Sequence, residues 1–180
     1  MDSDALFRQL EASASTIRCL IHGLSREHAS WKSDLRKWSI LETMVHLLDE
    51  ERADFRVRLD ILLHRPGDPW PGIDPEGWVT EREYAKRDLQ ESLETFLEER
   101  AKSIEWLRGL PSPEWNNSDS HPIAGTFHAG DMLAAWVAHD LLHIGQLARL
   151  HVEYLRHVAA PYSLRYATGG PPPGAEGEQA

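Results

Sequence analysis

Two histidines in the C-terminal half of the chain have the spacing of a metal-binding pair. His139 and His143 are four residues apart in the segment 131–150, DMLAAWVAHDLLHIGQLARL. Apolar residues recur there at intervals of three and four, which predicts one long helix with both histidines on its core face. Two imidazoles one turn apart can direct their ring nitrogens at one divalent metal ion. Because two ligands make a weak site, the rest of the chain must supply more.

His46 is the best candidate for a third ligand. It lies in WSILETMVHLLDEERADF, where the capping box Ser39-Ile40-Leu41-Glu42 predicts the start of a helix that runs to about His64. On this helix His46 shares a face with small and apolar residues, and Glu50 follows one turn later. Three neutral imidazoles would leave a fourth position on Zn²⁺ open for water or substrate, which is the arrangement of catalytic sites.

The alternative is that these are ordinary histidines with hydrogen-bond partners. The chain has ten histidines, so one H-x-x-x-H pair is nearly an even bet by chance. Against this, two imidazoles without partners would be costly to bury on an apolar face. Glu50 is the candidate for a general base or a supporting residue, and Asp140 and Gln146 are the candidates for orienting the ligands. For Glu50 and Asp140, a salt bridge with Arg or Lys on a neighbouring helix is at least as good an explanation.

The apolar periodicity predicts the elements that must position these residues. A helix is expected to begin at a second capping box, Thr80-Glu81-Arg82-Glu83. No segment has a convincing strand pattern, so the predicted fold class is all-α, a four-helix bundle with long connecting loops. The four predicted helices cover about residues 3–24, 39–64, 80–110 and a last segment that ends before Pro161.

Length and composition indicate one globular domain. The chain has 180 residues, of which 41% are hydrophobic and 27% charged. Residues 1–160 are predicted to form the bundle, and residues 161–180, rich in Gly and Pro, a disordered tail. The net charge of −10, from 29 acidic and 19 basic residues, argues against nucleic acid and against an anionic membrane surface as partners.

Cysteine usage and the N-terminus predict a cytoplasmic protein. Cys19 is the one cysteine, which excludes an intramolecular disulfide and fits a reducing compartment. Nothing near it in sequence would activate it as a nucleophile. The acidic N-terminus lacks the features of a signal peptide, and no stretch approaches the ~18 apolar residues of a membrane span.

Two connections, 65–79 and 111–129, are long for a helical bundle, and long connections often form lids or rims. Trp70 and Trp78 in the first could cover a pocket, although pinning the loop to the bundle is the favoured role. His121 and His128 in the second are interpreted as loop or helix-start residues rather than ligands, and either could line the mouth of a site.

The two histidine segments together resemble the DinB-like metal-binding bundle family over about residues 3–157. The resemblance rests on W-S-I-L-E-T-M-V-H-L-L-D-E-E in an early helix, followed late by A-H-D-L-L-H-I-G-Q-L. It implies a four-helix bundle in which His46, His139 and His143 hold one divalent metal. Dimers are common in this family. The segment His121-Pro122-Ile123-Ala124-Gly125 also resembles a connector in part of it.

Members of that family transfer low-molecular-weight thiols, such as bacillithiol or mycothiol, to electrophiles, and others resemble metal-dependent hydrolases or isomerases. We therefore expect a divalent-metal-dependent enzyme with a small-molecule substrate, which acts by thiol transfer or metal-assisted hydrolysis and forms a homodimer. Zn²⁺ or Ni²⁺ is the favoured metal, and Fe²⁺ or Mn²⁺ would also suit three imidazoles. Two alternatives stay open: a non-catalytic metal- or ligand-binding stress-response module, and a structural bundle without a metal.

Overall fold

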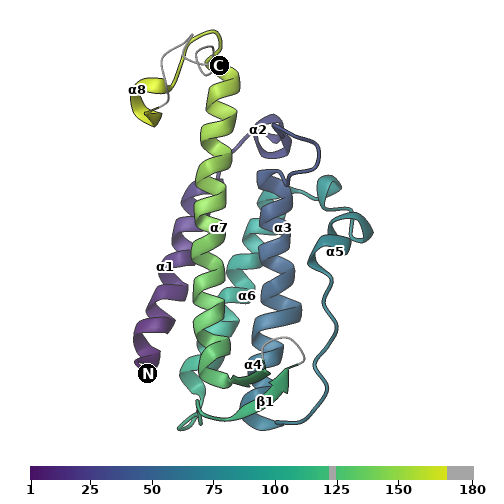
Figure 1. The fold of residues 1–180 in the computed structure, drawn as a ribbon, viewed down its shortest axis with the longest axis vertical. Helices are drawn as coiled ribbons and strands as arrows, with labels where there is room; N and C mark the ends of the chain where they lie inside the picture. The colour runs from purple at the N-terminus through teal and green to yellow at the C-terminus, as the bar shows by residue number, and fades with distance from the viewer. Residues whose placement is uncertain (122–124, 170–180) are drawn as a thin grey trace, which may run out of the picture.

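Four long helical segments lie side by side (Figure 1). The computed structural model describes residues 1–121 and 125–169. The predicted all-α four-helix bundle with long connecting loops is confirmed. The long segments are α1 (Ser3–Ile21), α3 (Ile40–Glu50) with its continuation through a π-helical turn (η1, Glu51–Phe55) into α4 (Arg56–His64), α6 (Leu89–Gly109) and α7 (Ala129–Val158). The shorter elements are α2 (Arg26–Ser30), α5 (Pro75–Glu81), the 3-10 turn η2 (Tyr84–Lys86), β1 (Ser118–His121), β2 (Gly125–His128) and α8 (Arg165–Thr168).

Side-chain caps begin three of the long helices. The carboxylate of Asp2 accepts from the backbone N–H of Ala5 at the start of α1, and Asp88 caps α6 in the same way. At α3 the predicted capping box is complete, because the Ser39 hydroxyl accepts from Glu42 N and the Glu42 carboxylate accepts from Ser39 N. These bonds satisfy N–H groups that have no partner within the helix.

The connection 65–88 sets the topology of the bundle. It carries the chain from the end of α4 back to the other end of the bundle, where Arg26 donates to the carbonyl of Ala85. After α6 the chain returns to the first end, where the Asn117 amide donates to the Leu63 carbonyl. As a result α3 and α6 are parallel neighbours, and so are α1 and α7 (Figure 1).

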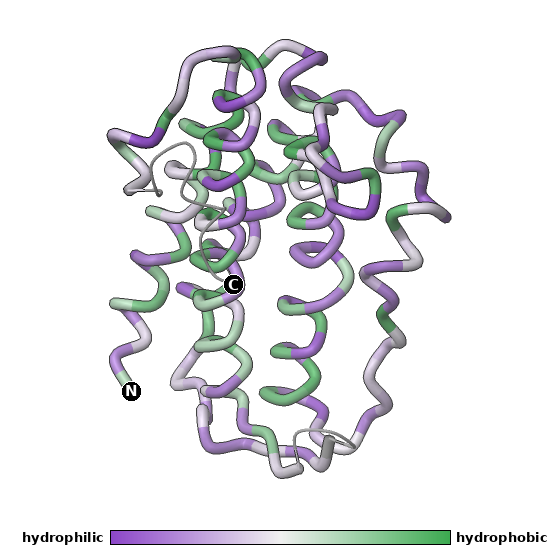
Figure 2. The backbone as a smooth tube through the Cα atoms, turned by 45° about the horizontal axis from the view of Figure 1, so that its top comes forward, coloured by the Kyte–Doolittle hydropathy of each residue, from purple (hydrophilic) through white to green (hydrophobic). Residues whose placement is uncertain are grey.

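Amphipathic helices bury two apolar clusters in the centre of the bundle. Hydrophobic and hydrophilic residues alternate within each helical turn, as the green and purple segments of Figure 2 show. One cluster includes Ile17, Met44 and Phe96, and the other includes Leu59 and Trp136. Each buried aliphatic or aromatic side chain contributes roughly 1.5–3 kcal/mol relative to full exposure, so these clusters hold the helices together.

Two secondary-structure predictions are wrong. No helix begins at Thr80: α5 ends at Glu81, Glu83 has a left-handed φ of 51°, and α6 begins only after Asp88. The second correction is a small antiparallel hairpin, in which Ser118 of β1 pairs with His128 of β2. It lies at the end of the bundle near α4 (Figure 1).

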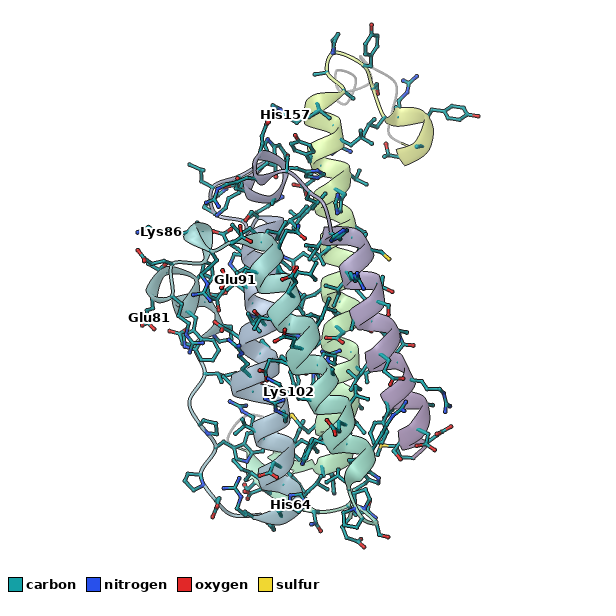
Figure 3. The ribbon with its side chains drawn as sticks, turned by 180° about the vertical axis from the view of Figure 1, so that it is seen from behind. His64, Glu81, Lys86, Glu91, Lys102 and His157 are labelled. Atoms are coloured by element: carbon teal, nitrogen blue, oxygen red, sulfur yellow. The ribbon has the colours of Figure 1, made fainter. Side chains whose placement is uncertain are left out.

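The last helix extends beyond the rest of the bundle. His157 lies near its C-terminal end and His64 at the opposite end of the molecule (Figure 3). In the tail predicted to be disordered, 161–180, the structure describes the short helix α8, and residues 170–180 lie outside the described part of the chain. None of the described helices combines the length and apolar character needed to cross a membrane.

Candidate metal centre

The structure brings His46, His139 and His143 together, as the sequence predicts. His46 Nε2 lies 3.2 Å from the Nε2 atoms of both His139 and His143, and those two atoms are 3.1 Å apart. The three nitrogens are close enough to share one cation at bond lengths of about 2.0–2.1 Å. Among the described residues, this is the group of His, Cys, Asp and Glu side chains whose geometry could hold a metal ion.

Two antiparallel helices supply these ligands. The capping box at Ser39 begins α3 and places His46 in its second turn, where its side chain is buried. His139 and His143 lie one turn apart on α7 and are half-buried. An i, i+4 pair on one helix that faces a single residue on another brings three imidazole rings to one point.

Aromatic rings hold two of the imidazoles in place. The Trp38 ring lies 4.8 Å from the His46 ring, and the Phe55 ring lies 4.9 Å from that of His139, both measured between centroids. Neither residue was predicted as part of the site. The sequence did contain a signal for Trp38, which directly precedes the capping box at Ser39. A residue at the start of α3 is close enough to the second turn of this helix to contact His46.

Burial keeps the three imidazoles in the form that can bind a cation. Burial, together with the neighbouring His143, lowers the pKa of His46 to about 3 and that of His139 to about 2. The pKa of His143 is also lowered by burial, while its hydrogen bond to Gln146 acts in the opposite direction. All three rings are therefore neutral at pH 7, as imidazole ligands must be.

Gln146 fixes the proton position on His143. The His143 Nδ1–H donates to Gln146 Oε1 at 2.7 Å. With the proton on Nδ1, the Nε2 atom presents its lone pair to the other two histidines. A hydrogen bond of this kind on the far ring nitrogen is usual for metal-binding histidines.

Glu50 lies on the far side of His46. Its Oε1 atom is 3.8 Å from His46 Nδ1, which is too long for a hydrogen bond. Both atoms are buried, and neither has a hydrogen-bond partner among the described residues. Burial, together with the nearby Asp54, raises the pKa of Glu50 to about 8. The carboxyl group therefore keeps its proton at neutral pH and faces the ring nitrogen that points away from the candidate metal position.

Asp140 forms a buried salt bridge. Its carboxylate accepts from both Nη atoms of Arg100 on α6, at 2.5 and 3.1 Å. This is the alternative that the sequence left open for Asp140. Burial raises the pKa of Asp140, and the adjacent Arg100 guanidinium lowers it.

The two histidines of the second long connection lie away from the triad. His128 caps the start of α7, where its Nδ1 is 3.0 Å from the Asp131 carboxylate. His121 ends β1, and residues 122–124 of the predicted HP-x-x-G connector lie outside the described part of the chain. Both positions fit the predicted loop and helix-start roles.

The two long connections meet around a cavity of about 420 Å³. Arg58 forms one wall, and its guanidinium lies 5.0 Å from the centroid of the Trp70 ring. Its other lining residues are Gly67, Asp68, Pro69, Pro71, Asp119 and Ser120, and none of these is a histidine of the triad. Trp78, by contrast, is buried against the bundle, as expected of a side chain that pins a loop.

Comparison with protein families identifies the class of this chain. The family model of the DinB superfamily matches residues 9–147, so the chain belongs to that superfamily and the resemblance is confirmed. A comparison with curated proteins finds no match.

The fold is similar to that of YfiT from Bacillus subtilis. The TM-score is 0.74 with 17% sequence identity, and the match covers 87% of each chain. YfiT is described as a probable metal-dependent hydrolase with an unusual four-helix bundle topology. At this identity the match shows a shared fold.

Proposed function

We propose that this protein is a divalent-metal-dependent enzyme that acts on a small-molecule substrate. The observation that carries the proposal is the convergence of three neutral imidazole nitrogens, 3.1–3.2 Å apart, from α3 and α7. Neutral imidazoles packed this closely have no proton-sharing pattern that satisfies every contact, whereas one cation satisfies all three lone pairs. Membership of the DinB superfamily and the description of YfiT both support this function.

The ligand set restricts the metal and the chemistry. Three imidazoles suit Zn²⁺ or Ni²⁺ best, with Fe²⁺ and Mn²⁺ as weaker candidates. When bound, such an ion would lower the pKa of a thiol or a water molecule at its open position and make it nucleophilic near neutral pH. The two candidate reactions are therefore transfer of a low-molecular-weight thiol to an electrophile and hydrolysis.

The surrounding residues would keep the ligands in place. Gln146 holds the His143 proton on Nδ1 and so leaves Nε2 free. Glu50 is proposed to hold His46, because its carboxyl group faces Nδ1 on the side of the ring opposite to the other histidines. That placement favours this supporting role over the role of a general base, which would have to reach the substrate. Closing the 3.8 Å gap would give both buried atoms a partner.

We also propose that the enzyme works in the cytoplasm as a homodimer. The exposed Cys19 thiol fits a reducing compartment. Large apolar side chains are exposed along α7, which supports association of two copies through this helix. They are Leu141, Leu142, Val152, Leu155 and Val158. Light scattering would measure the mass, and a monomer at all concentrations would contradict the dimer.

Metal content tests the central proposal. Protein purified without an affinity tag is expected to contain about one divalent ion per chain by mass spectrometry. His139→Ala should lose it, and the matched control His157→Ala, which changes a histidine near the far end of the same helix, should keep it. A wild-type protein that stays metal-free after incubation with Zn²⁺ and with Ni²⁺ would overturn the proposal.

A screen of thiols with electrophiles, and of hydrolysable esters and amides, then separates the hypotheses. Turnover that His46→Ala abolishes would establish an enzyme and choose between the two reactions. Full metal occupancy without any turnover would instead favour the non-catalytic binding module.

A further inference from the structure

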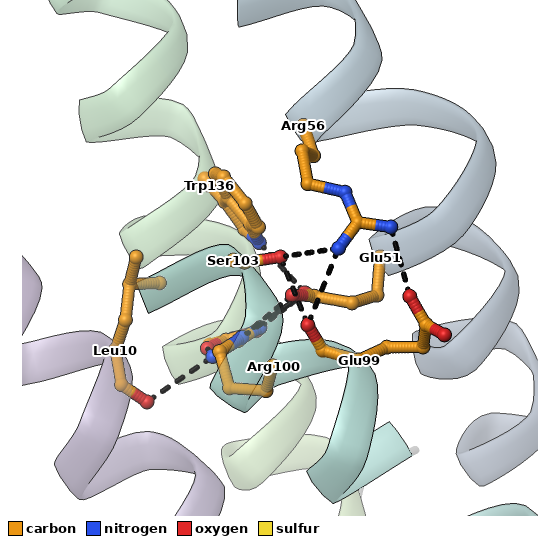
Figure 4. A network of polar contacts seen from close by, with 8 residues as sticks. Leu10, Glu51, Arg56, Glu99, Arg100, Ser103 and Trp136 are labelled. Carbon is orange, nitrogen blue, oxygen red and sulfur yellow. Dashed lines mark hydrogen bonds and ion pairs between the residues drawn. The ribbon is translucent and has the colours of Figure 1, made fainter. Parts of the chain in front are cut away.

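A buried arginine connects all four long helical segments. The Arg100 side chain on α6 is 3% exposed, and its guanidinium donates to Glu51, to Asp140 and to the carbonyl of Leu10 (Figure 4). Nε and Nη2 bond the Glu51 carboxylate at 2.8–3.1 Å, and Nη1 bonds Asp140 Oδ2 at 2.5 Å. Nη2 also reaches Asp140 Oδ1, and Nη1 reaches Leu10 O, both at 3.1 Å. Each of the five N–H donors of the guanidinium therefore has an acceptor.

The two carboxylates held by Arg100 adjoin the histidine site along the chain. Asp140 directly follows His139 on α7. Glu51 directly follows Glu50, whose carboxyl group lies 3.8 Å from His46 Nδ1. Arg100 thus joins the helix that carries His46 to the helix that carries His139 and His143.

A further bond ties the same two helices. The indole Nε1–H of Trp136 on α7 donates to Glu51 Oε2 at 3.1 Å. The Arg100 guanidinium also lies between the two apolar clusters, 5.1 Å from the ring centroid of Phe96 and 5.6 Å from that of Trp136. Directional bonds therefore set the spacing of α3 and α7 within a core that is otherwise held by non-directional apolar contacts.

Stability alone does not explain why Arg100, Glu51 and Asp140 are buried together. Moving three charges out of water is costly, and apolar residues of similar volume often give an equally or more stable protein. The role that such groups fill best is to fix one arrangement of helices among several. A metal site with ligands from two helices needs one fixed arrangement of those helices, because metal–ligand distances tolerate shifts of only about 0.2 Å.

We propose that Arg100 is a positioning residue for the histidine site: by holding Glu51 and Asp140 it sets the separation and register of α3 and α7. The inference rests on the proposed function, since it assumes that the three histidines bind a metal ion. It assigns Asp140 an indirect role, in which the residue next to a ligand locks the backbone of α7 to α6 and α3.

The test separates affinity for metal from stability. A triple variant with Arg100→Met, Glu51→Gln and Asp140→Leu removes all three charges and leaves an acceptor for the Trp136 indole. We expect it to remain folded by circular dichroism and urea unfolding but to bind Zn²⁺ at least tenfold more weakly in a chelator competition, as for loss of other supporting groups. Arg100→Lys is the second variant. It keeps the charge, but three donors on one nitrogen cannot reach both carboxylates and the Leu10 carbonyl.

The matched control is Arg56→Met. Arg56 joins α4 to α6 through a 2.8 Å salt bridge with Glu99 and a hydrogen bond to the Ser103 hydroxyl, next to the Arg100 network (Figure 4). Among the described residues, it forms no hydrogen bond or salt bridge with α7. It should leave the Zn²⁺ affinity unchanged.

Folded Arg100 variants with wild-type affinity would overturn the inference while leaving the metal site intact. Equal losses of affinity in the Arg100 variants and in Arg56→Met would also overturn it, because the effect would then belong to the bundle in general. A wild-type protein without measurable Zn²⁺ binding would instead overturn the proposed function itself.

Discussion

Each histidine of the triad is constrained by a different kind of neighbour. His143 donates a hydrogen bond to Gln146, His46 faces the carboxyl group of Glu50, and His139 packs against the ring of Phe55. Gln146 forms the one short polar bond among these three contacts, so it should have the largest effect on the tautomer of its partner. This difference can be measured.

Replacing Gln146 by Leu should weaken metal binding with little effect on folding. The change removes the acceptor of the His143 proton, so the ring can place its proton on Nε2 and lose its ligand lone pair. Loss of such a partner typically lowers metal affinity about 10–100-fold. Zn²⁺ affinity by chelator competition measures the effect, with Gln146→Glu, which keeps an acceptor oxygen, as the control. Equal affinities for wild type and Gln146→Leu would show that Gln146 does not set the tautomer.

The sequence predicted the histidine triad because helical periodicity alone fixes which residues share a face. It could not predict the partner of Asp140. That residue follows His139, so it points about 100° away around the helix, toward α6. The arginine it meets, Arg100, is 40 residues away along the chain. Which helices become neighbours depends on the topology, and that is not a local property of either residue.

At the scale of elements, the start of α3 matters most for the site. His46 lies in the second turn, so fraying of this end would release a ligand. The capping box at Ser39 opposes fraying, and the Glu42 carboxylate also forms a salt bridge with Lys32 at 2.7 Å. The position of His46 therefore depends on the cap at Ser39, because both lie at the N-terminal end of α3.

Ser39→Ala should destabilise the protein by about 1 kcal/mol, the usual effect of losing a side-chain N-cap. The backbone N–H of Glu42 would lose its acceptor in a buried position, where water does not replace it easily. Urea unfolding of the metal-free protein measures the change. Ser25→Ala is the control, because Ser25 caps the five-residue helix α2 through an exposed hydrogen bond and should have a smaller effect. Similar losses of unfolding free energy in Ser39→Ala and Ser25→Ala would mean that the cap of α3 stabilises the protein no more than the cap of α2 does.

The local sequence patterns also explain why the helix start at Thr80 was predicted incorrectly and why the hairpin was missed. Thr80 and Glu83 have the spacing of a capping box, but Asp74 and Asp88 are the residues that cap α5 and α6. Pairs of residues with the spacing of a capping box occur at several places in this segment. The packing of the Trp78 segment against α3 determines which candidate residue caps a helix. The strands of the hairpin, SDSH and GTFH, lack the apolar alternation that makes a strand visible in a sequence.

At the scale of the whole molecule, the parallel pairing of α3 with α6 follows from the long connection 65–88. Its length in the sequence indicated that it is unusual for a bundle, but not that it carries the chain back to the end where α3 begins. Apolar stripes specify that helices pack, and several orders of packing would bury them equally well. The bundle was therefore predictable, and its order of helices was not.

The buried titratable groups of the site should control the stability of the whole metal-free protein. The pKa values of His46 and His139 fall from 6.5 to about 3 and about 2 on folding, so below pH 6.5 the unfolded chain binds more protons than the folded chain. Their effect is a loss of stability as the pH falls. The pKa of Glu50 rises from 4.5 to about 8, so its effect is a loss of stability as the pH rises between these values. From pH 6.5 down to about 5, the two histidines outweigh the one carboxyl group.

Metal-free wild type should therefore lose stability between pH 6.5 and 5.0 more steeply than His139→Gln. The variant takes up fewer protons on unfolding, by about half a proton at pH 6.5 and nearly one at pH 5, so the difference between the two slopes should rise toward about 1.4 kcal/mol per pH unit as the pH falls. Urea unfolding in the presence of a chelator at the two pH values gives both slopes. Parallel pH profiles for wild type and His139→Gln would mean that His139 titrates normally in the folded protein, so protons would compete with the metal for the triad throughout the weakly acidic range.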